Sequence, residues 1–376
     1  MEVSKTKWVL IFVIIGVYIG ILVMFRLSNP TMIEFQTYQA WRYEYVKDQS
    51  AHQQFVNTGP VNQATALSEG QGYGMQIVAQ AGAKGWASKK DFDRLVNYYL
   101  DHRLTVNHRE TSLMSWRQRR DHQGQWHSEN QSATDGDLTI ADALITAANT
   151  WPQRQGFYKH LAKNLADDIL KYEYNPGENM LTVSTWATPD DSAYHLMRTS
   201  DVMPLVFTKL AVTSHDNRWD KLNDSMLSKL ETLSQQHKSG LVPDFARVDG
   251  LSVRPAKAHS VATAWDGYYG SNACRVPMML ASSNDPRAKK IVAKMMHFFQ
   301  RQGYVTAGYS LQGKPLTKYQ SRAFSAPIFY AADANKQSGY DGLFQSQSYI
   351  FHKPIQADHY YDATLTTLAV FGGITQ

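Results

Sequence analysis

The feature of this sequence that most limits its fold is a series of about twelve helical runs. In each run, apolar residues recur at three- and four-residue spacing, which is the pattern of the buried face of an α-helix. The runs cover residues 35–48, 71–81, 91–102, 137–150, 157–174, 202–212, 219–237, 264–281, 286–302, 322–332, 343–352 and 360–371. We therefore expect an all-α fold.

The runs differ in how polar they are. Residues 137–150 and 360–371 are apolar nearly all round, whereas residues 157–174 and 219–237 have one apolar and one polar face. A helix that is apolar all round is a buried one. The contrast predicts an inner layer of helices wrapped by an outer layer, with residues 113–116 in a small ribbon near one rim.

The hydrophobic core alone must hold this fold together. Cys274 is the single cysteine, so no intramolecular disulfide can form, and we expect it to be a buried small apolar residue rather than a catalytic thiol. A chain of 376 residues that is 43% hydrophobic can bury a large core. No linker or low-complexity tract interrupts it after residue 31, which predicts one domain over residues 31–376, acting as a monomer.

The N-terminus carries an uncharged apolar stretch at residues 8–25, WVLIFVIIGVYIGILVMF. Eighteen such residues are near the minimum that crosses the hydrocarbon layer. Lys5 and Lys7 precede the stretch, which favours a cytoplasmic tail over residues 1–7, a single-pass anchor over residues 8–25 and a domain outside the membrane. The alternative is a cleaved signal peptide, but the stretch is long for one and no small-residue cleavage site follows it.

The charge pattern argues against nucleic acid as a partner. The formal net charge is +5, but the Lys and Arg residues are spread along the chain and form no basic stripe. Motifs of zinc proteases, serine hydrolases and nucleotide-binding loops are absent, and the 13 histidines show no metal-ligand spacing. We expect neither a cofactor nor a metal.

Residues 68–75, Ser-Glu-Gly-Gln-Gly-Tyr-Gly-Met, stand out because Glu69 opens a helical run that contains three alternate glycines. Each glycine in a helix costs about 1 kcal/mol relative to alanine, so the close approach of a substrate or of another backbone is expected here. A carboxylate at a helix start also stabilises the first turn. Stabilisation of the first turn explains Glu69 but not the glycines. The unexplained glycines favour a functional role for this segment.

A second constellation, Ala-Thr-Asp-Gly-Asp at residues 133–137, comes immediately before an apolar run. One aspartate or the threonine at such a position commonly caps the helix. Two aspartates around a glycine also place carboxylates at the end of a core helix, where a cleft is expected. Our interpretation is that one of them caps the helix and the other faces a ligand.

These segments resemble glycoside hydrolase family 8. The family's S-E-G-Q-x-Y-G-M segment is matched at residues 68–75, and its signature around A-[ST]-D-[AG]-D is matched from residue 133 to Trp151. Residues 273–277 resemble its A-C-R-x-P block, and Tyr360 with Tyr361 resemble its C-terminal Tyr-Tyr helix. The matching blocks span most of the chain beyond residue 31.

The resemblance implies an (α/α)6 barrel of six helical hairpins that inverts the anomeric configuration as it cleaves a β-linked polysaccharide. Inversion requires one carboxylic acid that protonates the leaving oxygen and one carboxylate that activates water about 6.5–9.5 Å away. By its place in the family segment, Glu69 is the acid. Asp135 matches a family aspartate that binds and distorts the sugar at the cleavage point.

The sequence departs from the family pattern at the base. Many members have an aspartate directly before A-C-R, whereas this chain has Asn272, which cannot accept a proton. Asp266 is our first alternative base, provided that its segment begins in a loop, and Asp244 is the second. For each of them a capping or turn role is an equal alternative.

Several aromatic residues are suited to stacking against sugar rings, although core packing is the ordinary role of any single one. Asn272 is expected to contact the substrate, and Arg275 either holds a carboxylate in place or forms a structural ion pair. The aromatic residues are Tyr73, Trp116, Trp265, Tyr268 and Tyr361.

The leading hypothesis is therefore an endo-acting hydrolase, tethered outside the cell membrane, that trims an exopolysaccharide or a cell-surface glycan. Its main rival is a catalytically silent glycan-binding protein on the same scaffold, which Asn272 suggests. A helical-barrel lyase would need a Tyr or His base and leaves residues 68–75 unexplained.

Overall fold

The computed structural model describes residues 8, 11–18, 29–60, 62–351 and 353–373. The tail predicted at residues 1–7 lies outside the described residues, as does most of the anchor predicted at residues 8–25. Within the described ranges, no helix is both long enough and apolar enough to cross a membrane.

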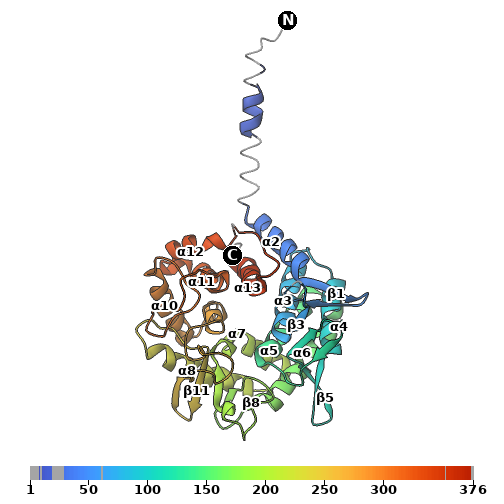
Figure 1. Cartoon of the computed structure of the whole chain (residues 1–376), viewed down its shortest axis with the longest axis vertical. Helices are drawn as coiled ribbons and strands as arrows, with labels where there is room; N and C mark the ends of the chain where they lie inside the picture. The colour runs from blue at the N-terminus through green and yellow to red at the C-terminus, as the bar shows by residue number, and fades with distance from the viewer. Residues whose placement is uncertain (1–7, 9–10, 19–28, 61, 352, 374–376) are drawn as a thin grey trace.

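Twelve α-helices between residues 30 and 373 of the described chain form two concentric layers (Figure 1). The inner helices α3, α5, α7, α9, α11 and α13 pack in succession, and α13 returns to α3 and closes the ring. The even-numbered helices pack outside them. The bounds are α2 Pro30–Tyr45, α3 Ser68–Ala83, α4 Lys89–Asp101, α5 Thr134–Thr150, α6 Gln155–Tyr172, α7 Pro204–Ser214, α8 Arg218–Gln235, α9 Val276–Leu280, α10 Pro286–Gln300, α11 Arg322–Ala334, α12 Asp341–Gln347 and α13 Tyr360–Gly373.

The predicted helix number and layering are confirmed. The apolar runs at 137–150 and 360–371 became the inner helices α5 and α13, and the amphipathic runs at 157–174 and 219–237 became the outer helices α6 and α8. An inner helix has neighbours on every side, so it is apolar all round, whereas an outer helix keeps one face in water.

The glycines at the start of α3 and α5 allow these two helices to pack closely. A Cβ atom at Gly72 would lie 2.2 Å from Thr139 Oγ1, and one at Gly136 would lie 2.2 Å from Ser68 Oγ. Both distances are far below van der Waals contact. Of the two explanations offered for these glycines, the structure supports the approach of another backbone.

The helix predicted at residues 264–281 is wrong over most of its length. Residues 256–272 form an irregular loop, and helical structure begins with a 3-10 turn at Ala273–Arg275 followed by α9. Gly267 packs against the carbonyl oxygen of Ala256, where a Cβ would lie 2.3 Å away. Asp266 accepts hydrogen bonds from the backbone of its own loop, and these local interactions override the apolar spacing.

Short antiparallel strands connect parts of the barrel, and the helical periodicity did not predict most of them. The pairing order within the sheets is β1-β2, β3-β6-β7, β4-β5, β8-β9 and β10-β11-β12. The strands are β1 Val46–Ser50, β2 Gln53–Val56, β3 Thr65–Leu67, β4 Arg103–Val106, β5 Arg109–Met114, β6 Arg117–Arg120, β7 Trp126–Ser128, β8 Tyr174–Asn175, β9 Met180–Leu181, β10 Leu196–Arg198, β11 Phe245–Asp249 and β12 Ser252–Pro255. Of the ribbon predicted at residues 113–116, residues 113–114 end β5, and residues 115–116 connect it to β6.

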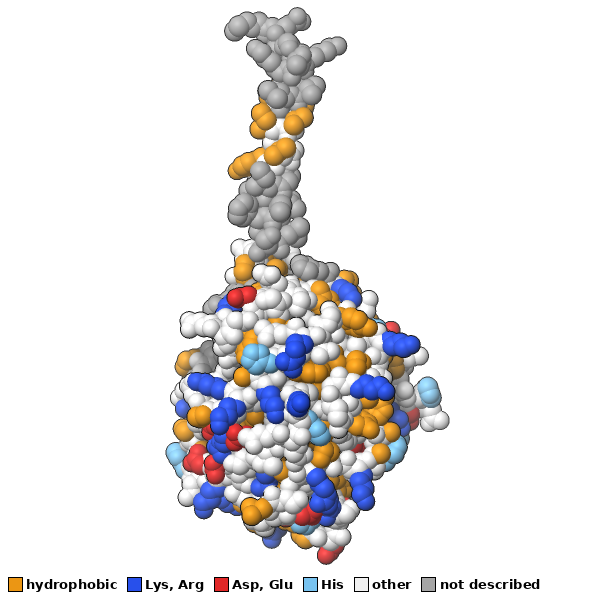
Figure 2. All heavy atoms as spheres, turned by 90° about the vertical axis from the view of Figure 1, so that its left-hand side faces the viewer, with side chains coloured by type: hydrophobic (Ala, Val, Ile, Leu, Met, Phe, Trp, Pro, Cys, Tyr) orange, Lys and Arg blue, Asp and Glu red, His pale blue; other side chains and the backbone are white. Residues whose placement is uncertain are grey.

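Figure 2 shows the face on the side of α10 and α12, where Lys and Arg side chains are dispersed among uncharged ones.

Candidate active site

A pocket with a volume of about 470 Å³ lies where α3 and α5 begin, and its lining includes Glu69 and Asp135. We call it the central pocket. Glu69 is the second residue of α3, and Asp135 is the second residue of α5. The close packing of these two helices therefore brings the two predicted carboxyl groups together at one end of the barrel.

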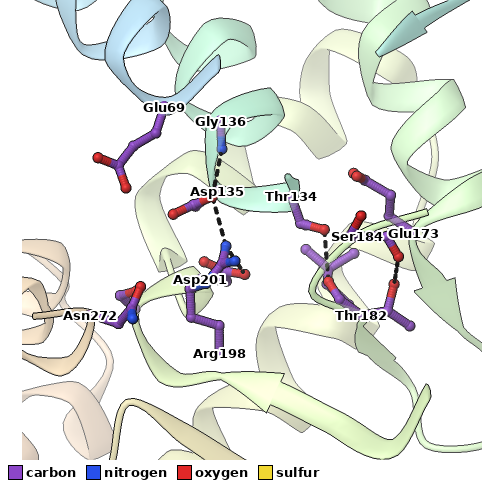
Figure 3. A network of polar contacts seen from close by, with 12 residues as sticks. Glu69, Thr134, Asp135, Gly136, Glu173, Thr182, Ser184, Arg198, Asp201 and Asn272 are labelled. Carbon is purple, nitrogen blue, oxygen red and sulfur yellow. Dashed lines mark hydrogen bonds and ion pairs between the residues drawn. The ribbon is translucent and has the colours of Figure 1, made fainter. Parts of the chain in front are cut away.

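The carboxyl groups of Glu69 and Asp135 share the guanidinium group of Arg275, whose Nη1 donates to Glu69 Oε2 at 2.9 Å and to Asp135 Oδ2 at 3.1 Å (Figure 3 shows both carboxyl groups). Burial raises the pKa of Glu69 to about 7, with the nearby charge of Asp135 adding to the shift and Arg275 opposing it. A substantial fraction of Glu69 is therefore protonated at neutral pH. Its side chain keeps 18% of its surface exposed toward the pocket.

Asp135 is ionised. Its burial alone would raise its pKa, but Arg198 and Arg275 together hold the pKa of Asp135 well below its usual value. Arg198 Nη1 lies 2.7 Å from Asp135 Oδ1, and Arg275 Nη2 lies 3.1 Å from Oδ2. The pair thus consists of one neutral acid and one carboxylate.

Arg275 is fully buried and joins the parts of this site. Both guanidinium Nη atoms donate hydrogen bonds at 2.8–3.1 Å. The acceptors are Glu69, Tyr73, Asp135, Ser200 and the side-chain oxygen of Asn272. Of the two roles expected for Arg275, the structure supports the one in which it holds carboxyl groups in place.

Tyr73 does not offer a stacking surface in the central pocket. Its side chain is 2% exposed, and its hydroxyl accepts a hydrogen bond from Arg275 at 3.0 Å. The prediction that Tyr73 stacks against a sugar is therefore wrong, and its hydroxyl instead supports Arg275.

Asn272 lines the central pocket across from Glu69, and Asp244 lies directly behind it (Figure 3 shows Asn272). Asp244 Oδ1 accepts hydrogen bonds from the backbone N–H groups of Gly270, Asn272 and Ala273. Burial raises the pKa of Asp244 to about 6 although these N–H groups oppose the shift. The carboxylate therefore fixes the turn that carries Asn272 and Arg275.

Asp244 also lines a second pocket of about 390 Å³, which we call the side pocket. Ser271 lines the side pocket, and the next residue, Asn272, lines the central pocket. The two pockets are therefore neighbours along the cleft. Asp244 is the acidic residue in the described lining of the side pocket.

Asp266 does not reach either pocket lining. Its carboxylate accepts hydrogen bonds from the backbone N–H groups of Val261, Ala262 and Thr263, and it is 1% exposed. The prediction of Asp266 as the first alternative base is therefore corrected, because its carboxylate does not reach the cleft. Asp266 holds together a loop whose neighbouring residues line the cleft.

Aromatic side chains lie along the cleft on both sides of the carboxyl pair. Trp116 and Trp186 line the central pocket, and Trp265 and Tyr319 line the side pocket. Trp265 is 40% exposed, so its ring is open to solvent. The predicted positions of Trp116 and Trp265 agree with a sugar-stacking role.

Tyr268 and Tyr361 lie elsewhere. Tyr268 is 40% exposed but is in the lining of neither pocket. Tyr361 donates a hydrogen bond from its hydroxyl to the carbonyl oxygen of Ser271 at 2.6 Å. It supports the turn between the pockets.

Sequence reasoning missed Arg198, Asp201 and Trp186. Arg198 ends β10, and Asp201 Oδ2 accepts a weak hydrogen bond from it at 3.4 Å. Burial raises the pKa of Asp201 to about 7. An arginine between Met197 and Thr199 was the available signal, but isolated arginines are mostly exposed, so it drew no prediction.

In the part of the chain that the structure describes, no group of three or more His, Cys, Asp or Glu side chains is arranged to hold a metal ion.

Comparison with known proteins agrees with this arrangement. The sequence model of the family described as glycosyl hydrolases family 8 matches residues 13–373. A β-glucanase of Niallia circulans is 29% identical over 78% of this chain and 73% of its own length. A probable endoglucanase of Novacetimonas hansenii is 27% identical over 89% of both chains.

The fold also has solved counterparts. The apo structure of a β-1,3-1,4-glucanase from Paenibacillus sp. X4 superimposes with a TM-score of 0.81 at 24% identity, over 92% of this chain and 93% of the other. These neighbours are (α/α)6 barrels, which agrees with the predicted ring of six helical hairpins.

Proposed function

The chain belongs to family 8 of the glycosyl hydrolases and is a glycosidase that acts on β-glycans, and from this we propose that it is an inverting endo-β-glucanase in which Glu69 is the general acid. The observation that carries the proposal is the Glu69–Asp135 pair, in which the pKa of Glu69 is raised to about 7 while that of Asp135 is lowered. A general acid is most effective when its pKa lies near the working pH.

Glu69 would donate its proton to the glycosidic oxygen as the bond to the anomeric carbon breaks. Asp135 stays ionised beside it, so its negative charge favours the positive charge that develops on the sugar ring. Arg275 keeps both carboxyl groups in place through its hydrogen bonds at 2.9 and 3.1 Å.

We assign the base to Asp244. Both carboxylate oxygens of Asp135 are held by arginines, Oδ1 by Arg198 at 2.7 Å and Oδ2 by Arg275 at 3.1 Å, so Asp135 is poorly placed to activate a water molecule. The carboxylate of Asp266 is occupied by its own loop. Asp244 has one oxygen bound by three N–H groups, which leaves the other available for a water molecule that attacks the anomeric carbon.

The substrate class follows from the cleft and the relatives together. Two adjoining pockets with aromatic rings at Trp116, Trp186 and Trp265 suit a chain that continues past the cleavage point on both sides, as endo-cleavage requires. The similar proteins are named β-glucanase, endoglucanase and β-1,3-1,4-glucanase. A mixed-linkage or β-1,4-linked glucan is therefore the substrate we propose.

We further propose that residues 8–25 anchor the enzyme in the cell membrane with the barrel outside. Lys5 and Lys7 before an uncharged stretch of eighteen residues support this orientation. Carbonate washing of membranes should leave the full chain in the pellet, and protease added outside the cell should digest the barrel. A freely soluble full chain would contradict the anchor.

The catalytic roles are tested on the full chain in a detergent without sugar headgroups, with barley β-glucan as substrate. Asp244→Asn keeps the oxygen that binds the three N–H groups and removes the base, so the rate should fall about 10²- to 10⁴-fold. Azide, which attacks without a base, should restore turnover and yield a glycosyl azide. Asp266→Asn is the matched control and should need no rescue.

If Asp244→Asn keeps its activity, or if azide does not restore the activity that it loses, Asp244 is not the base. If the wild type binds glucan but releases no reducing ends, the silent glycan-binding alternative replaces the proposal.

A further inference from the structure

A third pocket, with a volume of about 360 Å³, lies beside the central pocket and is lined by basic side chains. We call it the basic pocket. Its lining includes Arg247, Arg254, Lys257 and His259, and none of its described lining residues is acidic. The roles assigned to the catalytic residues do not use it.

The basic pocket and the central pocket share one face of the β10-β11-β12 sheet. Arg198 pairs with Phe245 across β10 and β11, and both line the central pocket. Leu196 pairs with Arg247 two residues along the same strands, and both line the basic pocket. Residues two apart on a strand lie on the same face about 7 Å from each other.

The sheet and the loop that follows it continue this path. Arg254 on β12 pairs with Arg247, which extends the basic lining to the third strand. Beyond β12, Ser260 lines the basic pocket and Val261 lines the central pocket. The two pockets are therefore consecutive positions along one wall.

The charges of the basic pocket are only partly balanced. Asp249 pairs with Arg247 at 3.1 Å and with Arg254 at 2.9 Å, so one carboxylate faces two guanidinium groups. The side chain of Arg254 remains 55% exposed. Lys257 and His259 are exposed on the loop that follows β12. A surplus of positive charge thus faces the solvent next to the cleft.

We propose that the basic pocket is a subsite for an acidic group carried by the polysaccharide, a carboxylate, phosphate or sulfate on a sugar next to those bound in the central pocket. This inference rests on the proposed glucanase function, because it takes the central pocket as the place where the backbone is bound and cut. The guanidinium groups supply paired N–H donors to such an anion, and Lys257 adds a mobile ammonium group. The natural substrate is accordingly an acidic or acid-decorated β-glucan.

The test uses Arg254→Gln/Lys257→Gln, which removes two exposed charges from the pocket and leaves the Arg247–Asp249 pair in place. The control variant Lys90→Gln/Lys289→Gln removes two exposed lysines from α4 and α10, outside the three pockets described, and has the same net charge. Both are compared with the wild type as full chains in detergent. The probes are carboxymethyl cellulose and hydroxyethyl cellulose of matched length.

Two readouts are needed. The first is migration in native gels that contain each polymer, which measures binding without catalysis. The second is kcat/KM for the release of reducing ends. For the basic-pocket variant, affinity and kcat/KM on the carboxymethyl polymer should fall about three- to tenfold, as loss of two exposed charge pairs predicts. The difference should shrink at 0.5 M salt.

Values on the hydroxyethyl polymer should stay within about twofold of the wild type, and the control variant should change neither polymer more than its net charge requires. Equal effects of both variants, or no preference of the wild type for the acidic polymer, would overturn the inference. Selective retention of the acidic polymer without hydrolysis would uphold the subsite and remove the proposed function.

Discussion

Two carboxyl pairs begin at the first turn of α5, two residues apart, and they differ in their neighbours. Asp135 pairs with Glu69 beside Arg198 and Arg275, at the wall of the central pocket. Asp137 lies near Glu173 behind that wall, and no ion pair reaches either of them in the described part of the chain. The comparison separates the effect of burial on the pKa of a carboxyl group from the effect of neighbouring arginines.

In the second pair, burial raises the pKa of both carboxyl groups. It raises the pKa of Glu173 to about 8, and burial beside Glu173 raises the pKa of Asp137 well above its usual value. Asp137 Oδ1 also accepts a hydrogen bond from the backbone of Met114 at 2.8 Å. In the first pair, two arginines ionise one member and leave the other as an acid. The two arginines create the difference: Arg275 was expected to hold a carboxylate or to form an ion pair, and Arg198 was missed.

The largest expected effect is that of Glu69→Gln, compared with the same substitution in the second pair. Glu69→Gln removes the transferable proton and should lower kcat on β-glucan by about 10³-fold. Glu173→Gln keeps a neutral side chain in place and should leave kcat within about threefold. Reducing-sugar assays of both variants measure this. Comparable losses would mean that Glu69 has no special role as a proton donor.

A smaller effect is expected from Asp135→Asn, which removes the carboxylate that helps to raise the pKa of Glu69. Arg275 remains and lowers that pKa, so Glu69 should lose its proton at a lower pH. The alkaline limb of kcat/KM, expected near pH 7 in the wild type, should move toward acid, and the maximum rate should fall about 10- to 100-fold.

The matched control for this shift is Asp137→Asn, which belongs to the pair without arginines. It should leave the alkaline limb in place. A limb that moves equally in both variants, or that stays fixed in Asp135→Asn, would show that Asp135 does not tune Glu69.

The smallest effect is one of stability. Glu173 holds a proton in the folded protein up to about pH 8, whereas in the unfolded chain it loses the proton near its ordinary value of 4.5. The folded state thus binds more protons, and stability falls as pH rises through this window. Glu173→Gln removes that cost and should stabilise the protein at pH 7 by on the order of 2 kcal/mol.

Urea unfolding of the wild type and Glu173→Gln between pH 5 and pH 8 measures this effect. The difference in the free energy of unfolding should grow with pH. A variant that is less stable by the same amount at every pH would instead show that Glu173 acts through hydrogen bonding alone.

The fold was largely predictable because its information is local. Helical spacing correctly predicted eleven of the twelve helices. The polarity of the runs also distinguished the inner helices α5 and α13 from the outer helices α6 and α8. The loop at residues 256–272 was not predictable from spacing, because Asp266 and Gly267 determine its path through contacts with their own loop.

The site was predictable where a motif carried it, at Glu69 and Asp135. It was not predictable where contacts join distant segments. Arg275 meets Glu69 across 206 residues, and Arg198 reaches Asp135 from β10, which no helical pattern indicates. Tyr73 was predicted to stack against a sugar but contacts Arg275 instead. Its burial against Arg275 depends on tertiary packing, which the local sequence does not show.

An inverting hydrolase cleaves the glycosidic bond in a single displacement, in which Glu69 protonates the leaving oxygen while water attacks from the opposite side. Proton NMR of the first products from a soluble β-glucan oligosaccharide distinguishes inversion from retention, because the anomeric signals are read before mutarotation mixes them. We expect the α-anomer of the new reducing end to appear first and the β-anomer to follow as mutarotation proceeds. A β-anomer that appears first would contradict inversion, because retention requires a covalent intermediate on a second carboxylate.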